Sequence, residues 1–281
     1  MTKLLSAGFR RMFRSAVFWL GLAVSCGYTL LGVLNNFYYK GVFVDTVIKA
    51  DHTLFPFAEF VALIAAVVVA LFIGREHADK TLRNKIITGH PRLSIYLSNL
   101  IVCATATAIL FVVPTILIGL AVGAPLLGGF DLSAKAFILP ALCYLLALLG
   151  FTSLFLLLAM SIDNRTVAAV TILLVVLALS WVPTPLRETL EAPEHVEQIV
   201  FSEELDDFVE TGEMIENEMY VGGPVRVVLQ VAYDLLPGCQ AQQTSPFNKT
   251  ADMVHLPVWS LVFIAATTAA GAVIFQKKEL K

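Results

Sequence analysis

Charged residues are scarce in this chain. Only 15% of its 281 residues are Asp, Glu, Lys or Arg, whereas 58% are hydrophobic and the mean hydropathy is +0.80. A soluble fold of this length has a larger charged fraction, because its surface must be solvated. The composition therefore excludes a soluble globular protein and points to a chain that lies largely within a bilayer.

The sequence also lacks the motifs of nucleotide and metal sites. It contains no GxxxxGK[ST] stretch, no HExxH stretch and no closely spaced pair of cysteines, so it has no standard means of holding ATP or zinc. No Ser-His-Asp set is apparent, and Ser153 lies in a leucine-rich run where a packing role is expected. Cys26, Cys103 and Cys143 fall within apolar runs, and only Cys239 lies outside them, so no disulfide is predicted. We expect neither an enzyme nor a cofactor-binding chain.

Six long apolar runs are what the sequence does contain. A helix needs about 20 apolar residues to cross the hydrocarbon core. The candidate spans are residues 15–36, 57–74, 96–124, 136–160, 165–182 and 257–276. We therefore predict an all-α membrane protein with six transmembrane helices and with both termini on the same side.

Basic residues are distributed unevenly about these spans. Thirteen of the 19 fall on the side that holds both termini: Lys3, Arg10, Arg11, Arg14, Arg75, Lys80, Arg83, Lys85, Arg92, Arg165, Lys277, Lys278 and Lys281. Lys and Arg are retained on the cytoplasmic side of a membrane. The bias predicts a multi-pass protein of the cell membrane with cytoplasmic termini.

The interiors of the spans hold almost no ionisable side chains. Glu59, near the outer end of span two, is the clearest case, and an interfacial role suits it better than a substrate contact. Carriers driven by protons or sodium usually place an acid or a histidine at mid-membrane to bind the coupling ion. A chain with so neutral an interior must draw its energy from elsewhere, or use none.

Two polar segments on the cytoplasmic side are predicted to be helical. Residues 2–14 place Leu5 and Phe9 on one face and Lys3 and Arg10 on another. This pattern is typical of a helix that lies flat in the inner leaflet, although a simple orientation signal would look similar. The second segment, residues 75–95, is much longer than a return loop requires.

Charge spacing in residues 75–95 indicates a short helix. Glu76 precedes Lys80 by four residues, and the same spacing separates Asp79 from Arg83. Acid before base at this spacing stabilises a helix surface.

Apolar residues and stop signals complete this pattern. Leu82 and Ile86 form a thin apolar stripe, Gly89 supplies a stop signal, and Pro91 suits the first turn of the next helix. We expect a soluble partner to dock on this segment.

Residues 183–256 differ from the rest of the chain, because they carry 14 acidic residues and three basic ones. We expect a small, mainly helical extracellular region that either attracts a cationic substrate or is simply solvated. Within it, residues 225–238 are apolar but too short to cross, which predicts a re-entrant or interfacial helix. Pro114 is expected to interrupt span three.

Two stretches carry a resemblance to a known family. Residues 74–92 read GREHADKTLRNKIITGHPR, which is similar to an E-x₃-G-T-[LI]-[RK]-N-K pattern, except that Lys80 stands where glycine is usual. Residues 233–240 read YDLLPGCQ, which is similar to an L-L-P-x-x-Q pattern. With the six spans, these stretches resemble the permease subunits of ABC-2 type ABC exporters, particularly those of Gram-positive bacteria. The acidic insert at about 187–222 is a departure from smaller members.

The resemblance implies a division of labour along the chain. Residues 1–182 would be a membrane domain that includes an N-terminal elbow helix and a coupling helix at about 75–89. Residues 183–256 would be the acidic extracellular region with a re-entrant segment at about 225–240, and residues 257–281 would be span six and a cytoplasmic tail. The residues implied to contact the ATPase are Glu76, Asp79, Lys80, Leu82, Arg83, Lys85 and Ile86.

The function implied is a subunit of an ATP-driven exporter. Two permease copies would form the substrate path, and two P-loop ATPase subunits would bind the ATP and magnesium. Nucleic acid is not expected as a partner. Amphipathic or antimicrobial peptides are the expected cargo, because the spans are neutral and the outer region is acidic. The alternative is a membrane immunity or sensor protein that binds a cationic peptide through that region without transporting it. Replacing Leu82 and Arg83 together is expected to uncouple ATP hydrolysis from transport.

Overall fold

The computed structural model describes residues 1–42, 49, 58–129, 134–202, 207–217, 219–244 and 253–278. Within these ranges, six helical segments are long and apolar enough to cross a membrane, as predicted. They are α2 (Ala16–Val42), α4 (Ala58–Ala78), α6 (Arg92–Pro114) continued by η1 (Thr115–Gly123) and α7 (Ala124–Leu127), α8 (Ala134–Ser161), α9 (Arg165–Trp181) continued by α10 (Pro183–Glu191), and α13 (Leu256–Lys277). Glu59 lies in α4, but its side chain is outside the described part.

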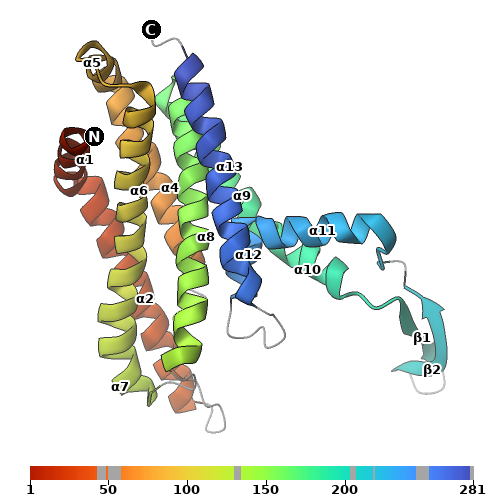
Figure 1. The fold of residues 1–281 in the computed structure, drawn as a ribbon. Helices are drawn as coiled ribbons and strands as arrows, with labels where there is room; N and C mark the ends of the chain where they lie inside the picture. Colours follow the sequence, from red (N-terminus) through yellow and green to blue (C-terminus); the bar gives the residue numbers. More distant parts are fainter. Residues whose placement is uncertain are drawn as a thin grey trace.

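The spanning helices form one bundle with two different ends. Figure 1 shows the two chain termini at the same end, next to α1 (Thr2–Phe13) and α5 (Thr81–Ile87). We call this the basic end, because the arginine and lysine residues of α1 and α5 lie there, together with Arg165 at the start of α9. Helices α4 and α8 lie at the centre of the bundle: they contact each other, both contact α9, and α8 also contacts α13.

Pro114 changes the type of helix in the third span. The α-helix ends at Pro114, and the chain continues from Thr115 to Gly123 as a π-helix before α7 begins. Proline has no N–H to donate and its ring crowds the carbonyl four residues earlier, so the regular pattern cannot pass through it. The Thr115 hydroxyl donates to the Phe111 carbonyl at 2.7 Å and so satisfies one of the acceptors nearby. The predicted interruption is therefore present as a π-helical segment.

Short hydroxyl hydrogen bonds join the helices inside the bundle. Thr152 of α8 donates to Thr107 of α6 at 2.8 Å, and Ser153 of α8 lies 2.7 Å from the Thr267 hydroxyl of α13. Ser25 of α2 donates to the Leu110 carbonyl at 3.0 Å. Such contacts satisfy polar groups without placing a charge in hydrocarbon. Ser153 therefore has the packing role that was expected of it.

The acidic region contains the predicted helices and an unpredicted β-hairpin. Helices α10, α11 (Gly223–Leu235) and α12 (Pro237–Gln243), with the short η2 (Met253–His255), are consistent with a mainly helical region. Between them, β1 (His195–Ser202) and β2 (Asp207–Glu216) pair antiparallel, with His195 opposite Glu216 and an irregularity between Glu197 and Ile199. The mainly helical prediction for this region did not include a hairpin. The alternation of apolar and charged residues, as in Val196-Glu197, is the strand pattern that was missed.

The segment predicted to be re-entrant or interfacial forms two helices. In Figure 1, α11 projects sideways from the bundle, nearly at right angles to α13. The side chains of Val225, Val227 and Val228 are exposed on it. By contrast, α12 is almost wholly buried against α8 and α9. The break between them falls at Leu236, which has an extended backbone and precedes Pro237.

Candidate functional site

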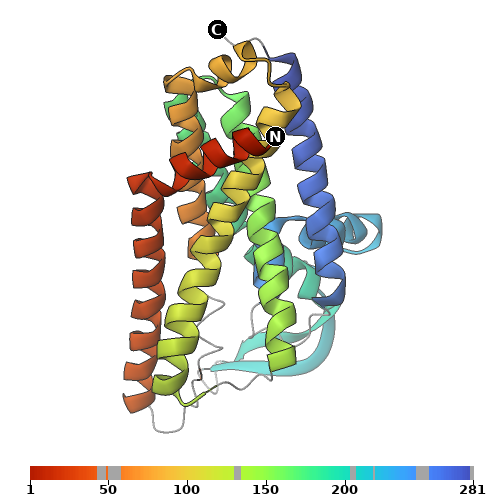
Figure 2. The same ribbon diagram turned by 60° about the vertical axis from the view of Figure 1, so that its left-hand side comes forward.

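The candidate site is the basic end of the bundle, where α1 crosses the spanning helices. Figure 2 shows α1 running across the bundle, roughly perpendicular to α2. Its residues Leu4, Gly8 and Met12 are buried, and Leu5 and Phe9 pack against the same core. A Cβ placed on Gly8 would lie 2.8 Å from Cγ2 of Val102 in α6, so the two helices are in close contact. The amphipathic helix predicted at residues 2–14 is present.

The polar segment after α4 also has the predicted form of a short helix, a stop and a new helix. Helix α4 ends at Ala78, and α5 begins at Thr81 after a sharp turn at Lys80, whose φ is +51°. Gly89, with a φ of +86°, ends the segment before Pro91 and α6. The turn at Lys80 breaks what the charge spacing treated as one continuous helix. Glu76 therefore pairs with Arg11 and Lys85, not with Lys80.

The backbone at Lys80 explains why glycine is usual at this position in the resembled pattern. A residue with a side chain pays about 1–2 kcal/mol to adopt the left-handed conformation, and glycine does not. We expect Lys80→Gly to raise the free energy of unfolding by up to about 1 kcal/mol, because chain entropy offsets part of the gain. Thermal unfolding of purified protein measures the effect. Lys80→Ala is the matched control: it removes the same charge, keeps a Cβ, and should give no such gain.

A buried carboxylate joins four elements at this end. Glu76 lies at the end of α4 with its side chain 1% exposed. Both of its oxygens accept from Nζ of Lys85 at 2.9 Å, and Oε2 also accepts from Nδ2 of Asn99 at 3.0 Å. The Arg11 guanidinium forms a further ion pair with Oε1. Helices α1, α4, α5 and α6 are thus held together at a single carboxylate, and we call Glu76, Lys85, Asn99 and Arg11 the Glu76 cluster.

Burial shapes the electrostatics of the Glu76 cluster. Removal from water, helped by the nearby Arg11 charge, lowers the pKa of Lys85 from 10.5 to about 8. Burial likewise lowers the pKa of Arg11, and the nearby Asp79 opposes that change. Arg11 also lies over the ring of Phe72, 5.5 Å from its centroid. Because two cations share one buried carboxylate, the cluster depends strongly on Glu76.

The residues predicted to contact a partner fall into two groups by exposure. Glu76 and Leu82 are buried, with exposed fractions of 1% and 2%. Lys85 and Ile86 are half-buried against the bundle. Asp79, Lys80 and Arg83 are exposed. A partner protein reaches only exposed side chains, so the Leu82–Arg83 double replacement proposed from the sequence would disturb the core as well as the surface.

One face of α5 and its preceding turn is open to solvent. Lys80, Arg83, Asn84 and Ile87 are exposed, and Ile87 is 71% exposed. Arg83, Asn84 and Ile87 lie three or four residues apart on the same side of α5, and Lys80 lies in the turn just before it. We call these four residues the α5 face. It combines two cations, an amide and one large apolar side chain.

Several basic residues that marked this end in the sequence bind the ends of helices. Arg92 donates to the carbonyls of Phe275 and Gln276 at 3.1 Å each, at the end of α13. Lys278 donates to the Met160 carbonyl at 2.9 Å and pairs with Asp163 at 2.7 Å. Cations stabilise helix C-termini because the last carbonyls are partly negative and lack backbone partners. These residues therefore have a structural use in addition to any effect on orientation.

Sequence reasoning missed Arg11, Asn99 and Ile87. Asn99 did carry a signal, because an amide within an apolar span needs a hydrogen-bond partner. Arg11 was counted only as one of several surface cations, and its long-range contact with Glu76 has no local pattern. Among the residues that the structure describes, no group of three or more His, Cys, Asp or Glu side chains could hold a metal ion.

A comparison with protein families gives one match over nearly the whole chain. The family is described as ABC-2 family transporter protein, and its model matches residues 11–280. A search of curated proteins finds no match. The matched range contains all six spanning helices, the Glu76 cluster and the α5 face.

Proposed function

The chain belongs to the ABC-2 family of transporter proteins, and from this premise we propose how it works as a permease. Membership makes it a multi-pass membrane component of an ABC transporter that works with an ATPase subunit. We propose that two copies form the substrate path and that two P-loop ATPase subunits bind the ATP and magnesium. The observation that carries this proposal is the α5 face, an exposed surface on a short helix that is joined to the bundle through the Glu76 cluster.

The orientation that we propose places the basic end in the cytoplasm. The positive-inside rule supports it, because α1, α5 and the turn at Arg165 are rich in Arg and Lys. An ATPase that uses cytosolic ATP would then meet α5. In this arrangement α1 acts as the elbow helix, and α11 with α12 acts as the re-entrant segment.

We further propose that α5 transmits the motion of the ATPase into the bundle. An ATPase bound to the α5 face would pull on a helix that is joined to α1, α4 and α6 through the Glu76 cluster. Glu76 is a buried carboxylate with several hydrogen-bond and ion-pair partners. These contacts favour movement of the four helices as one body, because separating the helices would leave buried charges unpaired. The exposed residues would bind the partner, and the buried ones would transmit its movement.

The cargo that we propose is amphipathic, with cationic or antimicrobial peptides as the leading class. Two observations support it. Helix α9 presents exposed apolar side chains, including Val170 and Leu174, to a membrane or a second copy. The β-hairpin exposes acidic side chains, including Glu197 and Glu213, that would attract cations. The same hairpin also suits the alternative of an immunity or sensor protein that binds a cationic peptide without transport.

Co-purification with an ATPase, followed by a coupling assay, tests the proposal. The chain is expressed with a candidate P-loop ATPase from the same organism, and the complex is reconstituted in liposomes. Arg83→Glu with Ile87→Asp is expected to lower substrate-stimulated ATP hydrolysis and transport at least tenfold, because it reverses a charge and removes the apolar residue of the α5 face. The permease should remain folded, since both side chains are exposed.

The control is Arg187→Glu, which reverses the charge of an arginine in α10, away from α1 and α5. It should leave ATPase binding unchanged. If no ATPase co-purifies and a cationic peptide still binds, the immunity or sensor alternative is correct. If the α5 double variant couples normally, the α5 face is not the contact.

A further inference from the structure

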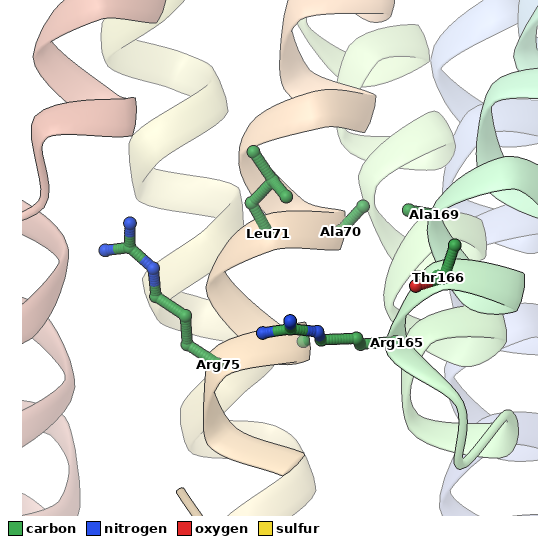
Figure 3. Close-up of a pocket in the computed structure, with 7 residues that line it drawn as sticks. Ala70, Leu71, Arg75, Arg165, Thr166 and Ala169 are labelled. Carbon is green, nitrogen blue, oxygen red and sulfur yellow. The ribbon is translucent and has the colours of Figure 1, made fainter. Parts of the chain in front are cut away.

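A cavity at the basic end lies between α4 and α9. Its volume is about 460 Å³, and it is lined by Ala70, Leu71, Gly74, Arg75, Arg165, Thr166 and Ala169. Figure 3 shows Arg165 reaching from α9 across toward α4, with Ala70, Leu71 and Ala169 farther from the basic end. We call this cavity the α4–α9 groove.

The α4–α9 groove has a charged mouth and an apolar wall. Arg75 and Arg165 are both exposed, and neither forms an ion pair within the described part of the chain. Arg75 donates to the Ser15 hydroxyl at 3.4 Å, and Figure 3 shows its side chain directed away from Arg165, so Arg165 reaches across the groove while Arg75 lies at its rim. Among the described residues that line the groove, none carries a negative charge. The mouth is therefore suited to an anion.

The apolar wall continues along both helices away from the arginines. Val67 and Leu71 are exposed on α4, and Val170 and Leu174 are exposed on α9. An inorganic anion would use the arginines and leave these side chains uncovered. A ligand with an anionic head and a long apolar tail would match both parts, because its tail would cover the apolar side chains while its head met the guanidinium groups.

We propose that the α4–α9 groove binds an anionic phospholipid by its phosphate headgroup. Arg165 would pair with the phosphate, Arg75 would add positive charge at the rim, the Thr166 hydroxyl would donate a hydrogen bond, and an acyl chain would lie along Leu71 and Val170. Basic pockets between transmembrane helices on the cytoplasmic side are suited to such headgroups. That the lipid comes from the inner leaflet rests on the orientation proposed above. The binding itself rests only on the groove.

Close packing at the base of the groove fixes the position of Arg165. A Cβ on Gly74 would lie 3.3 Å from Cβ of Arg165, so α4 and α9 approach closely at this point. Asn164 begins α9 with its side chain accepting from the N–H groups of Thr166 and Val167 at 2.9 and 3.2 Å. The first turn of α9, and with it the stem of Arg165, is therefore held in place before any ligand arrives.

Retention of defined lipids by the full-length chain tests the proposal. The protein is purified in mild detergent, stripped of lipid, and offered phosphatidylglycerol or phosphatidylcholine, and bound lipid is counted by native mass spectrometry. We expect phosphatidylglycerol to be retained at least tenfold better than phosphatidylcholine. Arg75→Gln with Arg165→Gln should abolish that preference. Lys3→Gln with Lys277→Gln removes two exposed charges from the same end outside the groove and should leave it intact.

A second variant separates a lipid from a free phosphate. Ala169→Phe fills the apolar part of the groove but keeps both arginines, so it should reduce phosphatidylglycerol retention while the protein stays folded, as checked by its thermal midpoint. Inorganic phosphate at millimolar concentration should not displace the lipid. Equal retention of both lipids, an effect of the Lys3/Lys277 control as large as that of the arginine pair, or displacement by phosphate alone would overturn the proposal. None of these measurements depends on an ATPase or on transport.

Discussion

Replacing Glu76 with leucine is expected to lower the free energy of unfolding by about 3–5 kcal/mol. That range is typical for removing one partner of a buried ion pair. The side chain is 1% exposed, and its loss leaves Lys85 and Asn99 without their shared acceptor. Lys85 is itself 14% exposed, so it can regain little hydration without moving α5. The measurement is equilibrium or thermal unfolding of the purified chain in detergent.

Hydrogen exchange gives a more local measurement of the same variant. If the Glu76 cluster holds α5 on the bundle, amides in residues 81–88 should exchange faster in Glu76→Leu, while those at the centre of α8 are unchanged. Asp79→Asn is the matched control, because it removes an exposed acid three residues away and should alter stability by about 0.5 kcal/mol or less.

A double replacement isolates the ion pair from the rest of the cluster. Glu76→Leu with Lys85→Leu removes both charges, so it should be less damaging than the sum of the two single replacements. Strict additivity of the two effects would contradict the assignment of Lys85 as the main partner of Glu76.

Gly238→Ala is expected to destabilise the chain by about 3 kcal/mol or more. A Cβ at this position would lie 2.1 Å from the Leu179 carbonyl oxygen of α9. Backbone cannot move aside as a side chain can, so α12 would have to shift from its buried position against α8 and α9. Overpacking of a tight core costs about 1–3 kcal/mol, and a clash with backbone belongs at or above the top of that range. A lowered thermal midpoint and loss of yield in detergent would report it.

Gly27→Ala is the matched control for this replacement. It introduces the same methyl group into a spanning helix, α2, at a point where no atom lies within 4 Å of the new Cβ. Alanine also favours a helix more than glycine does, so the stability should stay the same or rise. Equal destabilisation by both changes would mean that glycine flexibility, not close packing, matters at residue 238.

The spans were predictable from the sequence because the constraint on them is simple. A lipid environment demands about 20 apolar residues per crossing, and each predicted span overlaps an observed one. The stop at Gly89 was predictable for a related reason, since glycine readily adopts the positive φ that the backbone has there, whereas the turn at Lys80 was not predicted. Local chemistry determined these features, and local patterns revealed them.

The arrangement of side chains at the basic end could not be predicted in the same way. Charge spacing assigned Glu76 to the surface, but the turn at Lys80 directs α5 back so that Lys85, nine residues later, meets it. Arg11 and Asn99 come from elements that are 65 residues earlier and 23 residues later in the chain. These contacts depend on tertiary packing, which no short sequence pattern encodes.

The β-hairpin was missed because its acidic residues obscured its strands. Glutamate is uncommon in strands, and the dense charge suggested helices or solvated loops. In β2, however, Phe208 and Val209 stand opposite Phe201 and Val200 in the strand register. A search for alternating apolar and polar residues that ignored the sign and density of charge would have indicated the two strands.

The residues just before and just after the β-hairpin are hydrogen-bonded to each other. The Asn217 side chain donates to the Pro193 carbonyl at 2.9 Å, and its backbone N–H donates to the Glu194 carbonyl at 3.0 Å. Insertions or deletions between Glu194 and Asn217 therefore leave the distance between the two ends of the hairpin unchanged. The hairpin can thus change in length without altering the six helices that carry it.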